Sequence, residues 1–174
     1  KLARDVHKVS ILSPGGAQIK ARRVIIVENV KVLPQPFGCL FDCILDDSGN
    51  LKDKALAGGR VGVIDIGFNT LDLARADALE FNNPGSDSFS GQGLFSAFQE
   101  LSREIYRELE IEIPPEKLEP VVKERKITIA GKDRDVSALI DRAFTAAAEG
   151  IISRVKSIWP DRERWQFTQV LITG

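Results

Sequence analysis

The spacing of hydrophobic residues changes along the chain, and this change separates predicted strands from predicted helices. Short runs of β-branched residues are typical of strands, whereas apolar residues three or four positions apart are typical of one helix face. The short runs predict strands at residues 9–13, 22–34 (one or two strands), 60–67, 70–76 and 167–172, a short third strand at 78–82, and a strand-turn element at 126–132.

Helical spacing predicts four helices, the clearest of which has Leu94, Phe98, Leu101, Ile105 and Leu109 on one face. The predicted helices cover residues 35–45, 91–109, 114–122 and 136–158, and Pro160 ends the last one. Glycine, proline and asparagine predict turns at 14–16 and 46–50 and a loop at 83–91. This order of strands and helices predicts a mixed α/β protein.

The charge balance argues against a surface that binds nucleic acid directly. The 174 residues include 24 Lys and Arg against 25 Asp and Glu, which gives a net charge of −1. The chain is 43% hydrophobic and 28% charged, as in globular domains, and no apolar run reaches the roughly 18 residues of a membrane-spanning helix. We therefore expect no direct nucleic-acid partner and no membrane partner.

Two cysteines fall four residues apart in the predicted helix 35–45. We expect Cys39 and Cys43 to lie on one buried helix face as small hydrophobic residues, because the alternative, a disulfide within one helix, is geometrically awkward. With His7 as the only histidine, the sequence offers no zinc-binding cluster. The chain has no methionine, and its last residues, 170–174, have the pattern of a strand running into a turn, so we expect a piece of a longer protein.

The segment 63–72 carries the clearest chemical signal. A buried strand delivers Asp65 near its carboxyl end, and Gly67 allows a sharp turn whose backbone N–H groups can surround phosphate oxygens. The carboxylate can hold a hydrated Mg²⁺, and Thr70 adds a hydroxyl. The alternative is a plain β-hairpin in which Asp65 only caps the turn.

Two further features are weaker when each is taken alone. Gln35 stands at a predicted strand-to-helix corner, where an uncharged amide can orient a water molecule, although a helix-start residue between two prolines is the alternative. The terminal segment 171–174 is a strand ending in glycine, where a ligand can approach the backbone closely.

Together and in this order, the three features resemble the motifs of the actin-like ATPases, and within them the ParM/StbA-type proteins. Residues 64–72 resemble the second phosphate-binding motif, 32–38 resemble the connecting segment with its water-orienting Gln or Glu, and 170–174 resemble the start of the adenosine motif. The resemblance covers nearly the whole chain from Val24 onward. It implies an actin-like (ribonuclease H-like) α/β fold with ATP or ADP and Mg²⁺ as cofactors.

The resemblance also implies roles for single residues. Asp65 would contact Mg²⁺ through water, and the backbone of Gly67, Phe68 and Asn69 would face the β- and γ-phosphates, with Thr70 supporting the turn. Gln35 would position the attacking water, as the family's Gln or Glu does. Thr173 and Gly174 would begin the turn beside the adenosine. An adenine-side contact would fall on Lys123 or Glu124, for which the alternative is two solvated helix charges.

The sequence departs from the family pattern at two places. Residues 1–16 contain no first phosphate-binding hairpin, which in the family has an Asp-x-Gly and a following Lys, and no glycines follow Gly174. Because phosphoryl transfer depends on both walls of the cleft, we expect this chain alone to hydrolyse ATP negligibly.

The domain layout implied by the resemblance places the end of the first lobe and a connecting helix in residues 1–58. The core of the second lobe would take 59–90 and 136–174, with 91–135 as an inserted smaller subdomain. The function implied is that of a cytoplasmic ATPase that polymerises with itself and segregates plasmid DNA through a DNA-binding adaptor. Alternatives are a chaperone-type ATPase, a sugar kinase, which the glutamine at position 35 disfavours, and a scaffold without catalysis.

Overall fold

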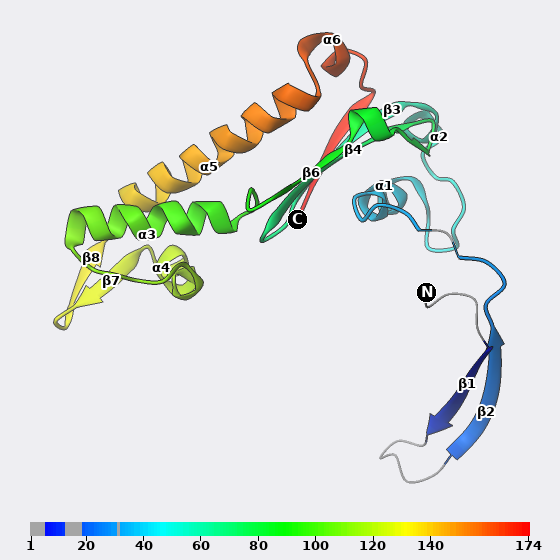
Figure 1. Cartoon of the computed structure of the whole chain (residues 1–174), viewed down its shortest axis with the longest axis horizontal. Helices are drawn as coiled ribbons and strands as arrows, with labels where there is room; N and C mark the ends of the chain where they lie inside the picture. The colour runs from blue at the N-terminus through cyan, green and yellow to red at the C-terminus, as the bar shows by residue number, and fades with distance from the viewer. Residues whose placement is uncertain (1–5, 13–18, 31) are drawn as a thin grey trace. The chain divides into compact units, whose positions relative to one another are not determined.

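The computed structural model describes residues 6–12, 19–30 and 32–174, and the chain divides into two compact units, Lys1–Leu33 and Pro34–Gly174. The first unit contains an antiparallel pair, β1 (Val6–Leu12) and β2 (Ile19–Ile26) (Figure 1). The predicted turn at 14–16 lies outside the described residues. In the described part of the chain, no helix is long and apolar enough to cross a membrane.

The strand predicted over 22–34 is partly wrong, since β2 ends at Ile26. The last residue of β2 pairs with Val6, the first residue of β1, so nothing in β1 remains for the following residues to pair with. The alternation at Val30 and Val32 is therefore not used in a strand, and both side chains are exposed. Backbone pairing, rather than the local pattern, decides where this strand ends.

A mixed sheet forms the centre of the second unit. The strands β3 (Arg60–Ile66) and β4 (Thr70–Asp77) form the predicted hairpin, and β9 (Gln169–Thr173) pairs parallel with β3. The strand order is β5-β4-β3-β9, with β5 (Glu80–Phe81) and β6 (Asp87–Ser90) both pairing antiparallel with β4. The predicted strands 60–67, 70–76 and 167–172 are thus confirmed.

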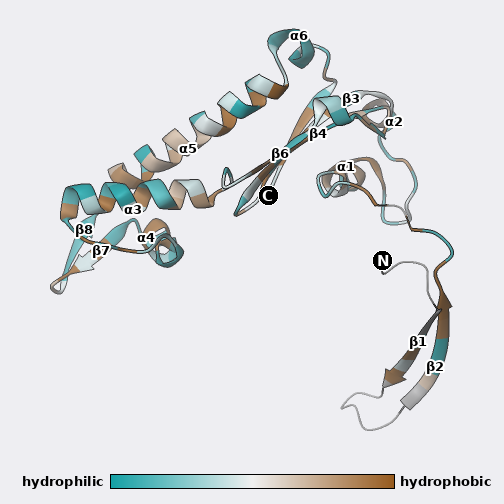
Figure 2. Ribbon diagram, viewed as in Figure 1, coloured by the Kyte–Doolittle hydropathy of each residue, from teal (hydrophilic) through white to brown (hydrophobic). Residues whose placement is uncertain are grey.

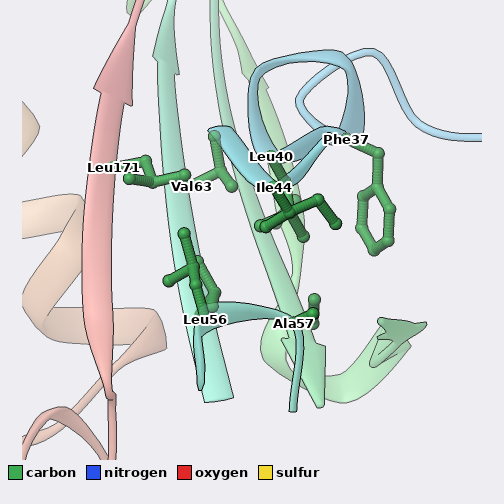
Figure 3. Close-up of a cluster of buried hydrophobic side chains, with 10 residues drawn as sticks. Phe37, Leu40, Ile44, Leu56, Ala57, Val63 and Leu171 are labelled. Carbon is green, nitrogen blue, oxygen red and sulfur yellow. The ribbon is translucent and has the colours of Figure 1, made fainter. Parts of the chain in front are cut away.

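Two short helices cover one face of this sheet. The helix α1 (Phe37–Ile44) confirms the helix predicted at 35–45, and α2 (Lys54–Gly58) was not predicted. Figure 3 shows their side chains packed on the sheet. This cluster consists of Phe37, Leu40, Ile44, Leu56, Ala57, Val61, Val63, Ala74, Ala76 and Leu171. Cys39 and Cys43 are free thiols, partly buried on α1 and packed against the same cluster.

The opposite face of the sheet packs on the end of the longest helix, α5 (Ser137–Ile158). Trp159 is fully buried there beside Ile64 and Leu73, and its indole Nε1 donates to the carbonyl oxygen of Gly85 at 2.8 Å. Pro160 follows the helix as predicted, and a short helix, α6 (Asp161–Arg164), that was not predicted leads to β9.

The remaining elements form a helical module with its own core. The helix α3 (Phe95–Leu109) lies beside α5, and the module also contains the 3-10 helix η2 (Pro115–Lys117), α4 (Glu119–Glu124) and the hairpin β7 (Lys126–Ile129)–β8 (Lys132–Asp135) (Figures 1 and 2). Its buried residues are Phe98, Leu101, Ile105, Leu118, Ile127, Val136, Leu139, Ile140 and Ala143.

Three predicted boundaries need correction. The segment predicted as a loop at 83–91 contains the 3-10 helix η1 (Asn83–Gly85) and the strand β6, because the edge of β4 offers that strand a partner. The helix predicted from Gly91 begins only at Phe95, since Gly91 has a left-handed φ of 72°. The strand predicted at 78–82 is shorter in the structure, where it covers only Glu80–Phe81.

Candidate functional site

Three polar side chains form a row at one end of the central sheet. Asp65 near the end of β3 lies opposite Asp72 on β4 and is in register with Thr173 on β9. Paired residues of neighbouring strands point to the same face of a sheet, so all three lie on the face that α1 covers. Asp65 is buried, with 5% of its surface exposed. The topology therefore places a buried carboxylate between a second carboxylate and a hydroxyl.

Gln35 approaches this row from the start of α1. Its Nε2 donates a hydrogen bond of 3.4 Å to Oδ2 of Asp65, which leaves the amide oxygen of Gln35 as an acceptor. The backbone turn before α1 holds Gln35 in place, because the N–H groups of Phe37 and Gly38 donate to the carbonyls of Pro34 and Gln35 at 3.0 and 2.9 Å. The structure thus brings together Gln35 and Asp65, which are 30 residues apart.

The turn at 67–69 is fixed through its carbonyl groups. The carbonyl oxygens of Gly67, Phe68 and Asn69 accept from the N–H groups of residues 94, 95 and 91 at 3.0, 2.8 and 2.7 Å. Among the hydrogen bonds of the described residues, none is donated by the backbone N–H of Gly67, Phe68 or Asn69. The turn therefore presents donors that neither the β-ladder nor α3 uses, as an anion-binding turn requires.

The side chains of Phe68 and Thr70 have contacts of their own. The ring of Phe68 packs at 5.4 Å from Phe95 and 6.1 Å from Phe98, measured between ring centroids, although 56% of the residue is exposed. The Thr70 hydroxyl donates to Oδ2 of Asp72 at 3.0 Å. The Thr70 hydroxyl thus holds the second carboxylate.

Gly93 was not singled out in the sequence, yet it makes the turn possible. A Cβ at this position would lie 2.8 Å from both the Phe68 carbonyl oxygen and the Thr70 nitrogen, and closer still to the Gly67 carbonyl oxygen. Only a residue without a side chain allows the segment before α3 to approach the turn this closely. The Gly-x-Gly pattern at residues 91–93 is the sequence feature that could have identified Gly93.

The end of β9 approaches β3 in a similar way. Gly174 has a φ of 140°, and a Cβ there would lie 2.6 Å from the carbonyl carbon of Ile66. Thr173, one residue earlier, is partly buried. Lys123 and Glu124 are exposed on α4, which packs on β7 and η2.

Of the row of Asp72, Asp65 and Thr173, only Asp72 lines an open cavity of about 490 Å³. Gln35, Asp72, Asp87 and Ser88 are among the residues that line it. In the described parts of the chain, no group of three His, Cys, Asp or Glu residues could hold a metal ion. Two carboxylates nevertheless fit Mg²⁺, which takes one or two protein oxygens and completes its shell with water and phosphate oxygens.

Asp72 is the functional candidate that the sequence reasoning passed over. It belongs to the motif 64–72, but its position opposite Asp65 depends on the pairing of β3 with β4 around the three-residue turn. The alternation of Leu71 and Leu73 with Asp72 signalled that its side chain lies on the opposite face from theirs.

Comparisons with known proteins concern the family and the fold of the chain. The family model of archaeal MreB-like actin homologues, C-terminal, matches residues 63–174. A comparison with curated proteins finds no match. The structure is similar to the archaeal actin homologue Ta0583, with a TM-score of 0.70 and 20% identity over 99% of this chain and 51% of that one.

Two ParM proteins share the fold as well. The ParM filament protein of Clostridium botulinum has a TM-score of 0.66 and 21% identity, over 88% of this chain and 46% of that one. Bacillus thuringiensis ParM with ADP has a TM-score of 0.61 and 14% identity, over 98% and 50%. The chain thus spans about half the length of these proteins, and the predicted actin-like α/β fold is confirmed.

Proposed function

This chain belongs to the family of archaeal MreB-like actin homologues, and we propose that it supplies one wall of an ATP-binding cleft. In this proposal the turn at 67–69 binds the β- and γ-phosphates through its backbone N–H groups. Asp65 serves Mg²⁺, and Gln35 orients the water that attacks the γ-phosphate. Thr173 and Gly174 lead into the turn beside the adenosine.

The observation that carries the proposal is that, in the described part of the chain, the carbonyl groups of the turn are hydrogen-bonded whereas its N–H groups are not. Its three carbonyls are bound by the segment before α3 and by the first residue of that helix, while its three N–H groups have no partner within the described structure. Fixed donors in a sharp turn bind anions without having to reorganise. A plain β-hairpin, the alternative for this segment, does not explain why Asp65 is buried beneath Gln35 at the same end of the strand.

The two carboxylates of the proposed site have different hydrogen-bond partners. Asp65 has the Gln35 amide as its hydrogen-bond partner, and Asp72 has the Thr70 hydroxyl. When bound, Mg²⁺ would offset the charge of these groups and of the phosphates. Gln35 cannot take a proton from the water, so its part is to hold the water by one donor and one acceptor bond.

Two of the similar structures support the nucleotide as ligand. Bacillus thuringiensis ParM and the archaeal homologue Ta0583 were each solved with ADP. Their shared fold supports the wider proposal as well: residues 59–90 and 136–174 form the core of the second lobe, 91–135 form its smaller subdomain, and 1–58 end the first lobe. The separate core of the helical module is in keeping with that division.

For the whole protein we propose filament formation with ATP and Mg²⁺, in the cytoplasm, with a DNA-binding adaptor linking filaments to plasmid DNA. The ParM filament of Clostridium botulinum supports self-association. Light scattering of the full-length protein should rise on adding ATP and Mg²⁺, and no rise over a range of protein concentrations would contradict the filament proposal.

The nucleotide site is tested by titrating the ¹⁵N-labelled chain with MgADP and recording its amide NMR signals. We expect the largest shifts at Gly67, Phe68 and Asn69, because their N–H groups would gain acceptors. Asp65→Asn should remove most of the shift that depends on Mg²⁺, whereas the matched control Asp47→Asn, an exposed aspartate in the 46–50 turn, should leave it unchanged. Shifts confined to other segments would overturn the proposal.

A further inference from the structure

Three phenylalanine rings meet at the start of α1. Phe37, the first residue of the helix, is 1% exposed and is labelled in Figure 3. Its ring centroid lies 5.8 Å from that of Phe81 on β5 and 6.0 Å from that of Phe41, one turn further along α1, and both pairs are T-shaped. Edge-to-face pairs have a preferred geometry, so they restrict the orientation of the Phe37 ring. Of the two contacts, the one with Phe81 joins the helix to the sheet.

The ring of Phe81 stands on a fixed part of the sheet. Phe81 pairs with Ala76 of β4, which belongs to the buried cluster under α1, so its side chain lies on the face that α1 covers. The next residue, Asn82, donates from its backbone N–H to the carbonyl of Arg75 at 2.9 Å and from its side chain to Asp77 at 2.7 Å. The position of Phe81 is therefore set by β4.

The last turn of α1 is held by hydrogen bonds to the segment that follows it. The side-chain ammonium of Lys52 donates to the carbonyl of Asp42 at 2.9 Å, and the backbone N–H of Lys52 donates to that of Ile44 at 2.8 Å. These contacts fix the end of the helix that is farther from Gln35.

The start of α1, next to Gln35, has fewer such bonds. Pro36 at the N-cap makes no side-chain cap bond. Among the hydrogen bonds of the described residues, only the one from Gln35 to Asp65 joins residues 34–37 to the sheet, and at 3.4 Å it is long. Because the backbone turn before α1 fixes Gln35 relative to Phe37, the packing of the Phe37 ring also places the Gln35 side chain.

We propose that Phe81 is a positioning residue: its ring orients Phe37 and so keeps Gln35 within hydrogen-bond reach of Asp65. Phe81 and Gln35 also line the same open cavity. The catalytic consequence rests on the proposed function, in which Gln35 orients the attacking water, whereas the effect of Phe81 on the position of Gln35 does not depend on any ligand.

Three variants test this role in the chain without nucleotide. Phe81→Leu keeps an apolar side chain but removes the ring, and Phe81→Tyr keeps the ring. Phe89→Leu is the matched control, because Phe89 pairs with Leu71 on the opposite face of the sheet. Circular dichroism first verifies that each variant is folded, and Phe81→Met replaces Phe81→Leu should the latter not fold.

The readout is the set of NOEs between the side-chain amide protons of Gln35 and the side chain of Asp65. A distance is measured because removing a ring changes nearby chemical shifts even when nothing moves. We expect Phe81→Leu to lose these NOEs, and Phe81→Tyr and Phe89→Leu to keep them. If Phe81→Leu keeps the NOEs, or if Phe81→Tyr or Phe89→Leu loses them as well, the positioning role is refuted.

ATP hydrolysis by the full-length protein tests the catalytic consequence. Phe81→Leu should lower kcat by about fivefold, the effect of losing one aromatic pair of average strength, and should leave KM for ATP unchanged, because Gln35 faces the water. Phe81→Tyr should restore kcat. In a Gln35→Ala background, Phe81→Leu should cause no further loss, because Phe81 acts through Gln35. An equal loss of kcat in both backgrounds would show that Phe81 does not act through Gln35.

The two proposals fail in different ways. If the wild-type full-length protein does not hydrolyse ATP, the proposed function fails, while the NOEs between Gln35 and Asp65 still decide the role of Phe81. If the wild-type protein hydrolyses ATP and Phe81→Leu does so at the same rate with its NOEs intact, the proposed function stands and the positioning role is overturned.

Discussion

Asp65 and Asp72 face each other across the antiparallel strands β3 and β4, with both carboxylates on the face of the sheet that α1 covers. Like charges directly opposite each other on a sheet are destabilising. The Gln35 amide and the Thr70 hydroxyl each donate to one of the two carboxylates, but neither brings a positive charge. In the proposed site, Mg²⁺ would offset the charges of this pair.

Replacing one carboxylate of this pair is expected to increase the stability of the chain without Mg²⁺ and to remove its stabilisation by Mg²⁺. Asp65→Asn should raise the free energy of unfolding without Mg²⁺ by up to about 1 kcal/mol, because it removes the repulsion. We expect Mg²⁺ to raise the Tm of the wild-type chain, and Asp65→Asn should abolish that rise. Thermal unfolding at low ionic strength, with and without Mg²⁺, measures both. Asp47→Asn, an exposed aspartate in the 46–50 turn, is the control and should keep the wild-type response. An equal Mg²⁺ response in Asp65→Asn would contradict the assignment.

Gly93 lies so close to the backbone of the turn at 67–69 that even a methyl group at this position is expected to disturb the turn. Gly93→Ala places a Cβ within 3 Å of the turn backbone, so the segment before α3 must move away from Gly67 and Phe68. We expect a loss of stability of about 1 to 3 kcal/mol, as for other overpacked sites, together with altered amide signals at 67–69. Denaturant unfolding and NMR provide the two measurements.

The matched control for Gly93 is another glycine with open surroundings. Gly150 lies within α5, and a Cβ there meets nothing within 4 Å. Gly150→Ala should therefore stabilise the chain by roughly 0.5 to 1 kcal/mol through helix propensity alone. If both substitutions changed stability in the same direction, the steric argument at Gly93 would be wrong.

A charge network around Asp77 predicts a loss of stability in acid. Arg75 donates to the Asp77 carboxylate at 2.8 Å and Arg60 at 2.7 Å, and these contacts, with that of Asn82, hold the pKa of Asp77 at about 2. The unfolded chain takes up this proton near an unperturbed pKa of 3.8, so acid favours the unfolded state.

The stabilisation from Asp77 should be complete above about pH 4 and should disappear as the pH falls through about 2. Because a third of the side chain is exposed, the contribution is expected to be roughly 1 kcal/mol. Denaturant unfolding of wild type and Asp77→Asn from pH 7 to pH 2 checks this. The difference between the two proteins should shrink across that interval, and a constant difference would contradict the prediction.

A buried carboxylate joins α3 to α5. Glu104 is 8% exposed and accepts from Nε and Nη2 of Arg142 at 3.1 and 2.9 Å, and these bonds lower its pKa. Arg142→Ala leaves this buried charge with Arg107 alone, so it should destabilise the chain clearly. Arg103→Ala breaks only an exposed pair with Glu100 and should have little effect. Equal Tm values for the two variants would refute the structural role of Glu104.

We also expect this chain alone to show negligible ATP turnover. Its proposed site offers the phosphates one wall, and residues 1–16 carry no Asp-x-Gly with a following Lys to form the other. Positioning from both sides dominates phosphoryl transfer. Phosphate release at saturating ATP and Mg²⁺ should match the buffer control, and turnover typical of a complete ATPase would show that a second wall is not needed.

Local patterns in the sequence were enough to identify the elements that hold the proposed site. The β-branched run before Gly67 predicted β3, the alternation after it predicted β4, and helical spacing predicted α1, α3 and α5. Each of these signals lies within a few residues of the feature it specifies, so no knowledge of the fold was needed. The resemblance of residues 64–72 to a known motif then identified Asp65 and the turn.

Two of the missed elements depend on distant partners. The five residues of α2 are too few to show helical spacing, and Leu56 and Ala57 become buried only because α1 and β3 lie against them. The strand β6 is mostly polar and forms because the edge of β4 is open to it. Conversely, the alternating residues after Ile26 did not form a strand, since β1 offers them no partner.

The sequence by itself determined the chemistry that is available, a carboxylate and a glycine turn at the end of a buried strand, because backbone preference and side-chain type are local properties. Only the tertiary structure decided which groups meet there. Thr173 comes beside Asp65 through parallel pairing of strands more than a hundred residues apart, and Gln35 reaches Asp65 through the packing of α1. Such contacts depend on the whole chain folding at once, so no local pattern can encode them.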